Sequence, residues 1–139
     1  MRPLPEIIED PNYLDENELA EIAVEIGFRI HRKWGPGLLE CVYEELMIFH
    51  LRKIGLFVEQ QKDVPFAEDG VKLPVAFRAD IIVEKKLMIE LKSIERFAPV
   101  HAKKLGTYLR LTNLKLGLLM NFGEYMLKDG LKRIINGYL

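Results

Sequence analysis

The segment that most restricts the fold is "RADIIVEKKLMIELKS", residues 78–93, in which apolar residues recur at almost every second position. This alternation predicts two β-strands joined as an antiparallel hairpin, because successive side chains of a strand point to opposite faces. The residues expected on one common apolar face are Phe77, Ala79, Ile81, Val83, Leu87, Ile89 and Leu91. The opposite face carries Asp80, Glu90 and Lys92, so charge accompanies the most strand-like part of the chain.

The register of this hairpin decides how the charges meet. If residues 84–86 form the loop, Asp80 faces Glu90 with Cβ atoms about 5 Å apart. Two carboxylates so placed repel each other unless one is protonated or a cation lies between them. A register with a five-residue loop instead sets Asp80 opposite Lys92 as an ordinary ion pair. The loop has no glycine, which weakens the tight turn, and both registers stay open.

Helical and strand patterns flank the hairpin. Apolar spacing with glycine and proline punctuation predicts helices over residues 15–33, 38–54 and 99–111, the second resting on Leu39, Val42, Leu46 and Phe49. Further strands are expected as a pair over residues 56–73, which turns at Asp69-Gly70 with Pro65 at an edge or bulge, and over 114–122. The tail, residues 125–139, is open between a hairpin and a short helix. This order predicts an α/β domain with a mixed sheet covered by helices.

Length and charge narrow the class of protein. A chain of 139 residues suits one domain, which we expect to span residues 15–139 after an irregular arm at 1–14. The 20 basic and 21 acidic residues nearly cancel, so any contact with nucleic acid must be local. The single cysteine, Cys41, is expected to be buried, and the absence of disulfides, signal peptide and membrane span in the pattern favours the cytoplasm.

Asp80, Glu90 and Lys92 have the chemistry of a metal-assisted hydrolytic site. Carboxylate oxygens, with a backbone carbonyl between Glu90 and Lys92, suit Mg²⁺ or Mn²⁺. Such an ion polarises a phosphoryl oxygen, and a lysine on the same face can orient water or offset charge in the transition state. Solvated surface charges are the alternative interpretation, and spacing alone does not decide between them.

Two motifs in this order resemble a known family. The arrangement "AD", nine residues, "ELK" resembles the signature of the PD-(D/E)XK nuclease superfamily. The segment "GPGLLECVYEELM" adds Gly37, Glu40 and Tyr43, which match the residues that name the GxxExxY protein family, a branch of that superfamily. The resemblance extends over roughly residues 16–136 and implies a restriction-endonuclease-like fold.

The resemblance also implies roles for individual residues. Asp80 and Glu90 become metal ligands, Lys92 the catalytic lysine, and Glu40 an acidic residue that joins the site from the preceding helix. Glu44, one turn further on, is expected beside the site or on the surface.

The helix after the site strands carries one departure from the family pattern. Many relatives have Gln-x-x-x-Tyr there, whereas this chain has Lys104 before Tyr108. A lysine cannot accept a hydrogen bond as an amide does, but it can contact a phosphate. The change therefore indicates either altered substrate handling or lost activity. Candidate substrate contacts are Tyr43, His101, Lys104 and Tyr108.

The sequence thus predicts a metal-dependent nuclease that uses Mg²⁺ or Mn²⁺, with nucleic acid as its partner, DNA favoured over RNA, and no membrane association. A homodimer is compatible with this prediction. The alternative is a catalytically inactive nuclease-fold module that binds nucleic acid or a protein. A third hypothesis, a plain interaction domain, predicts that Asp80 bonds Lys92 and lies far from Glu40.

Overall fold

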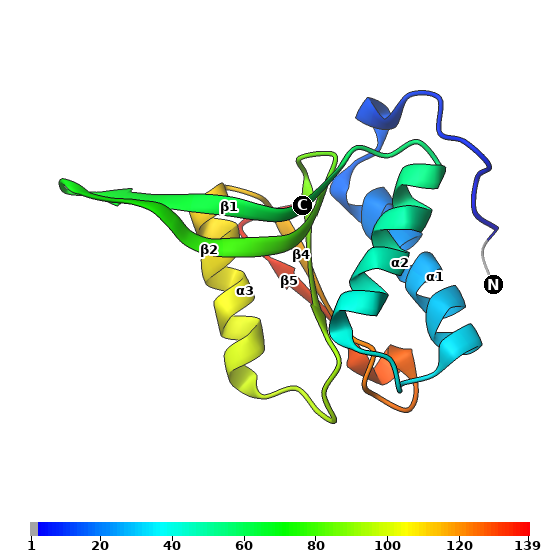
Figure 1. The fold of residues 1–139 in the computed structure, drawn as a ribbon. Helices are drawn as coiled ribbons and strands as arrows, with labels where there is room; N and C mark the ends of the chain where they lie inside the picture. The colour runs from blue at the N-terminus through cyan, green and yellow to red at the C-terminus, as the bar shows by residue number, and fades with distance from the viewer. Residues whose placement is uncertain (1–2) are drawn as a thin grey trace.

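Five strands form one sheet in the order β1-β2-β3-β4-β5 in the computed structural model, which describes residues 3–139 (Figure 1). The elements are α1 (Glu16–Trp34), α2 (Glu40–Lys53), β1 (Val58–Glu68), β2 (Val71–Val83), β3 (Leu87–Lys92), α3 (Pro99–Thr112), β4 (Leu116–Asn121) and β5 (Leu131–Ile135). Strands β3 and β4 are parallel, and the other neighbouring pairs are antiparallel. The predicted α/β class with a helix-flanked mixed sheet is confirmed.

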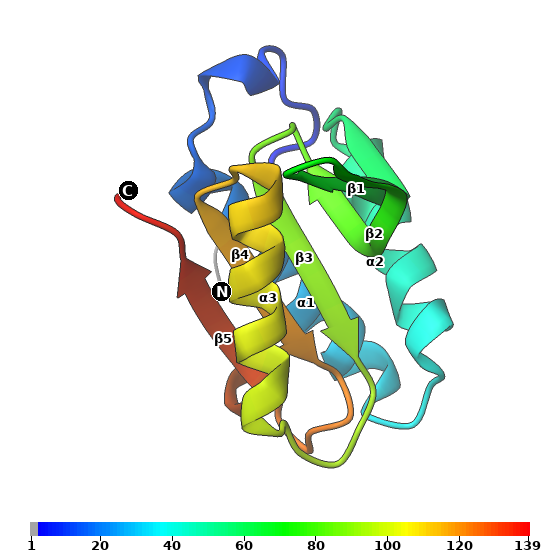
Figure 2. The ribbon, with the colours of Figure 1, turned by 90° about the vertical axis from the view of Figure 1, so that its left-hand side faces the viewer.

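The helices cover both faces of the sheet. Helices α1 and α2 lie on one face, and α3, which connects the parallel strands β3 and β4, lies across the other (Figures 1 and 2). Each face has its own core. The larger one includes Leu19 of α1, Tyr43 of α2 and Ile89 of β3, and the smaller one includes Met88 of β3 and Leu105 of α3. Neighbouring residues of β3 thus point into different cores, as strand geometry requires.

Helix α1 begins and ends at the residues that capping chemistry favours. The Asp15 side chain accepts a hydrogen bond from the Glu18 backbone N–H at 2.8 Å, and Glu18 Oε1 accepts from the Asp15 N–H at 3.1 Å. This is a complete capping box, which satisfies backbone N–H groups at the start of the helix. Gly35, with φ of 71°, ends the helix and donates its N–H to the His31 carbonyl.

Helix α2 is correctly predicted, but the apolar set that predicted it is not its buried face. Its core side chains are Tyr43, Met47, Ile48 and Leu51. The residues that gave the signal face outward instead: Leu39 is 72% exposed, Val42 38% and Phe49 59%, with Leu46 half-buried. Cys41 is also exposed, so the prediction that it is buried is wrong. The helix has apolar residues on two faces, and periodicity does not say which face meets the sheet.

The β2–β3 hairpin has the register with the short loop. Ile81 pairs with Ile89, and the turn places Glu84 and Lys85 at φ of 51° and 55°. The alternative five-residue loop is therefore wrong. Contacts with the neighbouring Phe57 replace the missing glycine: the Glu84 N–H donates to the Phe57 carbonyl at 2.8 Å, and the Phe57 N–H donates to the Glu84 carboxylate. These bonds hold a turn that non-glycine residues disfavour.

Strands β1 and β2 continue past the sheet as a two-stranded ribbon, seen projecting from the body in Figure 1. Its turn lies at Asp69-Gly70, as predicted, and the register shifts beside Pro65 in edge strand β1. The 13-residue strand β2 serves both this ribbon and the β2–β3 hairpin, whereas the sequence predicted separate strands. The β1–β2 ladder is interrupted between Ala79 and Ile81, opposite Gln61 with its φ of 49°. Phe77 and Ala79 pack in the α3 core, whereas Ile81 packs in the other core, so the predicted common face of these residues is wrong.

The ends of the chain pack against this framework. In the N-terminal arm the Ile8 N–H donates to the Ile54 carbonyl at 2.7 Å, and the arm contains a 3-10 helix at Pro11–Tyr13. The predicted boundary between residues 14 and 15 stays a prediction. The tail forms a 3-10 turn (Leu127–Gly130) and then β5. Within residues 3–139 no helix combines the length and hydrophobicity that a membrane span needs.

Candidate active site

The two carboxylates of the predicted site meet where strands β2 and β3 separate. The last paired residues of that ladder are Ile81 and Ile89, and beyond them side chains take over the backbone hydrogen bonds. The Asp80 N–H donates to Glu90 Oε1 at 3.2 Å, and the Leu91 N–H donates to Asp80 Oδ2 at 3.0 Å. Asp80 and Glu90 are thus held against each other by the backbone on which they lie.

Burial makes this contact electrostatically unfavourable when both groups are charged. Glu90 is only 9% exposed, and burial followed by the negative charge of Asp80 raises the pKa of Glu90 to about 8, against the opposing effect of Lys92. A proton on Glu90 relieves the repulsion at neutral pH. The negative field reaches α3, because Glu90 and Asp80, after burial, also raise the pKa of the Tyr108 hydroxyl.

Lys92 and three of the predicted substrate contacts lie around Glu90. These residues enclose a cavity of about 130 Å³. Its lining residues are Glu90, Lys92, His101, Lys104, Leu105, Tyr108 and Leu119. The aromatic ring of Tyr108 stacks on Phe77 with 3.8 Å between ring centroids, which fixes its position. Burial and then the positive charges of Lys92 and Lys104 lower the pKa of His101. The cavity therefore brings the Glu90 carboxyl and the Lys92 ammonium group of β3 together with His101, Lys104 and Tyr108 of α3.

Glu40 lies in the first turn of α2 and faces the same charges. Burial raises the pKa of its carboxyl, Lys92 lowers it, and Asp80 and Glu44 raise it further. Across the described part of the chain, residues 3–139, no group of three or more His, Cys, Asp or Glu side chains is placed to hold a metal ion. Glu40 is thus near the Asp80–Glu90 pair without completing a three-carboxylate cluster.

Sequence reasoning missed the amides that join α2 to the site. Gln61 Nε2 donates to Asp80 Oδ1 at 3.2 Å and to Glu44 Oε1 at 2.8 Å, and Gln60 Nε2 donates to Glu44 Oε2 at 3.0 Å. Glu44 is buried, so these bonds satisfy a carboxylate that would otherwise be costly. The two glutamines stand next to each other in the sequence "VEQQK". Their position opposite Asp80 depends on the β1–β2 register, which the sequence pattern does not reveal.

Tyr43 is not a substrate contact. Its side chain is 0% exposed, and its ring stacks on Phe122 at a centroid distance of 4.4 Å. The Tyr43 hydroxyl donates to the Gly35 carbonyl and accepts from the Leu38 N–H at 3.1 Å. Tyr43 instead ties the "GPG" loop to α2 and so fixes the start of the helix that carries Glu40. The prediction failed because a motif match does not reveal which way a side chain points.

A buried amide holds the chain as it leaves the site. Asn121, at the end of β4, is 0% exposed, and its Oδ1 accepts from the Ile94 N–H and the Gly123 N–H, each at 3.0 Å. A second hydrogen bond holds the same segment: the Ser93 hydroxyl donates to the Leu38 carbonyl at 2.8 Å. The segment after Lys92 is therefore anchored to both β4 and the loop before α2.

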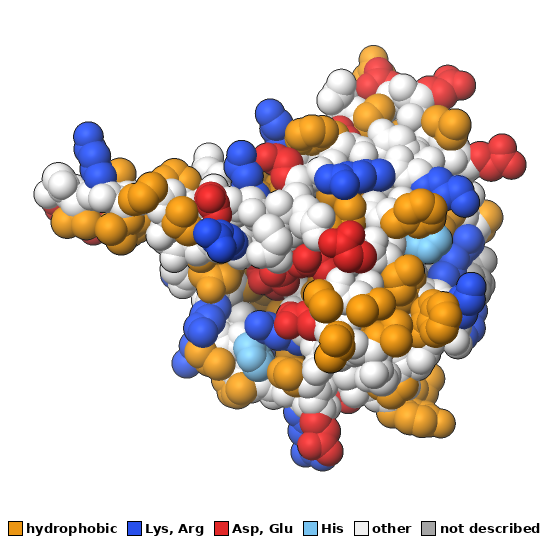
Figure 3. Space-filling model, in the orientation of Figure 1, with side chains coloured by type: hydrophobic (Ala, Val, Ile, Leu, Met, Phe, Trp, Pro, Cys, Tyr) orange, Lys and Arg blue, Asp and Glu red, His pale blue; other side chains and the backbone are white. Residues whose placement is uncertain are grey.

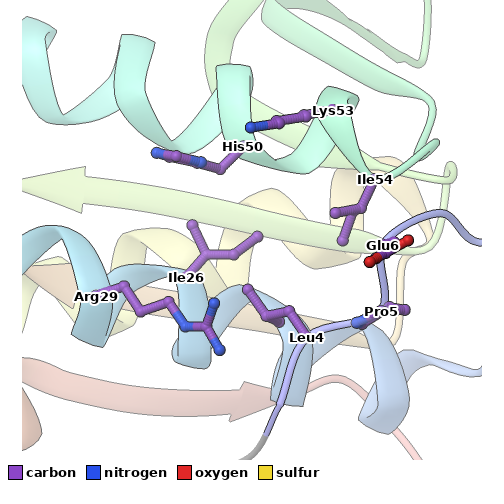
Figure 4. A pocket seen from close by; sticks show the side chains of 8 residues that line it. All are labelled: Leu4, Pro5, Glu6, Ile26, Arg29, His50, Lys53 and Ile54. Carbon is purple, nitrogen blue, oxygen red and sulfur yellow. The ribbon is translucent and has the colours of Figure 1, made fainter.

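A larger cavity, of about 370 Å³, lies away from these carboxylates (Figure 4). It is formed by the N-terminal arm, α1 and α2, and its lining residues are Leu4, Pro5, Glu6, Ile26, Arg29, His50, Lys53 and Ile54. It contains no pair of facing carboxylates. Figure 3 shows where acidic side chains gather instead, in the hollow between α2 and α3, with basic and histidine side chains beside them. We therefore choose the candidate site by its paired carboxyl groups and neighbouring basic side chains, and not by the volume of its cavity.

Comparison with known proteins identifies a family for most of the chain. The family model of the PD-(D/E)XK nuclease superfamily matches residues 17–134, a range that contains every residue of the candidate site. No curated protein and no solved structure matches the chain.

Proposed function

This chain belongs to the PD-(D/E)XK nuclease superfamily, and from that premise we propose that it is a metal-dependent nuclease acting through Asp80, Glu90 and Lys92. The observation that carries the proposal is the close approach of the Asp80 side chain to the buried Glu90 carboxyl, each bonded to the backbone beside the other. Natural proteins retain such a contact at a cost in stability, and perturbed carboxyl groups of this kind concentrate at functional sites. Assignment to the GxxExxY branch stays a prediction.

Asp80 and Glu90 fit a divalent cation in donor type and number. Mg²⁺ is commonly held by one or two carboxylates and completes its coordination with water and substrate phosphate. The positive charge of the ion would replace the proton that otherwise relieves the repulsion between the two groups. A bound Mg²⁺ or Mn²⁺ supplies charge that polarises a phosphoryl oxygen and lowers the pKa of water. Glu40, which lies near this pair without forming a three-carboxylate group with it among the described residues, is proposed as a further acidic ligand that would approach the pair when the ion binds.

The remaining steps belong to side chains of the chain itself. Lys92, two residues after Glu90 on β3, lines the cavity and would donate a hydrogen bond to the attacking water or to a phosphate oxygen as negative charge grows there. Lys104 lines the same cavity and would bind a neighbouring phosphate. His101 and Tyr108 complete the proposed contacts to substrate, which is nucleic acid with DNA favoured over RNA.

Cleavage assays with matched variants test this proposal. Purified protein is incubated with labelled single-stranded, duplex and branched DNA and RNA, in Mg²⁺, Mn²⁺ or EDTA. Asp80→Asn and Lys92→Met are expected to reduce metal-dependent cleavage by about 10² or more, the usual cost of removing a group that stabilises transition-state charge. The control is Asp63→Asn, which changes an exposed carboxylate bonded to Arg78 on the ribbon.

Activity that survives in both site variants would show a contaminating nuclease and reject the assignment. Calorimetric titration with Mn²⁺ gives a second readout that needs no substrate, since Asp80→Asn should remove the binding heat. Metal binding by the wild-type protein without cleavage of any substrate would point to the inactive binding module.

A further inference from the structure

The loop that follows β4 presents two large apolar side chains to solvent. Tyr125 is 87% exposed and Met126 is 47% exposed. Both line a cavity of about 670 Å³ that is formed by this loop, the last turns of α1 and the connection from α1 to α2. The loop, drawn in orange, and this connection lie at the same end of the molecule (Figures 1 and 2). Single exposed apolar residues are common, so their surroundings decide whether these two form part of a site.

The backbone of this loop is fixed although Tyr125 is exposed. The Gly123 N–H donates to Oδ1 of the buried Asn121 at 3.0 Å. One residue further on, Nε2 of the buried His31 donates to the Glu124 carbonyl at 2.9 Å. These bonds hold the backbone beside Tyr125 in place before any ligand binds, and a contact that is ordered in advance loses less entropy on binding.

The cavity combines aromatic, apolar and basic side chains. Phe28 and Pro36 line it with Tyr125, and Arg32 and Lys128 bring positive charge to it from α1 and from the loop. Among the described residues, 3–139, none of those that line the cavity is acidic. An aromatic ring beside cations suits single-stranded nucleic acid, because a base stacks on the ring while the cations pair with phosphates.

The cavity lies close to the candidate active site. Pro36, which lines it, is two residues from Leu38, and the Leu38 carbonyl accepts the Ser93 hydroxyl at 2.8 Å. Ser93 directly follows Lys92. Because each residue spans at most about 3.6 Å, the Cα atoms of Pro36 and Lys92 lie within about 20 Å of each other. A strand of about six stacked nucleotides spans this distance, at about 3.4 Å each.

We propose that this cavity binds an unpaired base of the nucleic-acid substrate, with the base stacked on Tyr125 and the adjoining phosphates held by Arg32 and Lys128. The identity of the substrate as nucleic acid rests on the proposed function. The cavity adds a preference for a substrate with a single-stranded segment within about six nucleotides of the bond to be cleaved. A base inside a duplex is covered on both faces by its neighbours, so it must leave the stack before it can reach Tyr125.

Fluorescence anisotropy with labelled DNA in EDTA tests the stacking without cleavage. Wild-type protein should bind a duplex with a single-stranded overhang of about six nucleotides at least about fivefold more tightly than the blunt duplex. Tyr125→Ser should bind the two alike, whereas Tyr125→Phe keeps the ring and should keep the preference. The control is Tyr138→Ser, which removes a tyrosine that is 90% exposed and should also keep the preference. Circular dichroism confirms that each variant is folded.

The salt dependence of binding tests the phosphate contacts. Lys128→Gln should reduce the slope of log K against log salt concentration for the overhanging duplex by about 0.7, the value for one contact to a single-strand phosphate. Lys72→Gln removes an exposed lysine of the β1–β2 ribbon and should leave the slope unchanged. An unchanged slope in Lys128→Gln overturns the assignment of Lys128 to a phosphate.

Three results overturn the base-binding cavity itself. They are wild-type protein without a preference for the overhang, Tyr125→Ser that keeps the preference, and polyglutamate that competes with DNA through Tyr125, which would show a site for acidic polypeptide. Failure of the proposed function gives a different pattern. Metal-dependent cleavage that needs Asp80, without a preference for the overhang, rejects the cavity alone. Binding that depends on Tyr125, without cleavage of any substrate, rejects the nuclease activity alone.

Discussion

Replacing Glu90 with glutamine is expected to stabilise the protein at alkaline pH in the absence of divalent cations. The substitution keeps the side chain's shape and an oxygen that can accept the Asp80 N–H, while it removes the ionisable group. The wild-type carboxyl must either carry a proton or place a second negative charge beside Asp80 in a buried site. Glutamine avoids both costs.

The sign and size of the effect follow from the pKa of Glu90. Folding raises this pKa from 4.5 to about 8, so between these pH values the folded protein holds a proton that the unfolded chain has lost. The free energy of unfolding therefore falls as pH rises through that window. An interval of about 3.5 pH units corresponds to about 5 kcal/mol as an upper limit, at about 1.4 kcal/mol per unit.

Urea unfolding in EDTA between pH 5 and 9, followed by circular dichroism, measures this difference. Glu90→Gln should match wild type near pH 5 and exceed its unfolding free energy by several kcal/mol near pH 8 and above. Glu95→Gln, which removes an exposed carboxylate after β3, should show no such divergence. Added Mn²⁺ should stabilise wild type most at high pH and Glu90→Gln least. Wild-type and Glu90→Gln curves that stay parallel across the range would refute the reasoning.

Two further substitutions test the contacts that position the site. Asn121→Ala removes the acceptor of the Ile94 and Gly123 N–H groups and should lower the free energy of unfolding in urea by about 1–3 kcal/mol. Gln61→Gly removes the amide between Asp80 and Glu44 at a residue whose φ is 49°, so the relief of backbone strain offsets only part of the roughly 1–3 kcal/mol cost of leaving the buried Glu44 carboxylate without this donor. Cleavage should fall by more than this loss of stability explains, and unchanged cleavage by the folded variant would contradict a positioning role.

The hairpin shows what could be predicted from the sequence. Period-two alternation placed both strands of residues 78–93, and the facing of Asp80 and Glu90 followed from the short loop. The choice between registers could not be made, because the turn at Glu84 depends on bonds to Phe57, a residue 27 positions away. Long-range contacts of this kind are invisible to local turn propensity.

Helix α2 shows the opposite case, in which the element was predicted and its orientation was not. The apolar line through Val42 and Phe49 was the stronger periodic signal, yet the sheet covers the line through Tyr43 and Met47. Burial depends on which face meets the sheet, and neither face is polar enough to exclude the other. The same ambiguity hid the role of Tyr43, which the motif marked as important without distinguishing a core residue from a contact to substrate.

The position of the carboxylates explains how the fold can carry a costly site. Where β2 and β3 separate, the N–H groups of Asp80 and Leu91 lose their partners on the neighbouring strand, and buried donors without acceptors are expensive. The Glu90 and Asp80 carboxylates accept these two hydrogen bonds, so each acid supports the backbone that holds the other. The arrangement fixes two like charges in contact and leaves their repulsion to a proton or a cation. Truncating one of these acids therefore removes both a hydrogen-bond acceptor for a backbone N–H and a negative charge. Asp80→Asn and Glu90→Gln separate the two effects, because an amide keeps an acceptor oxygen and carries no charge.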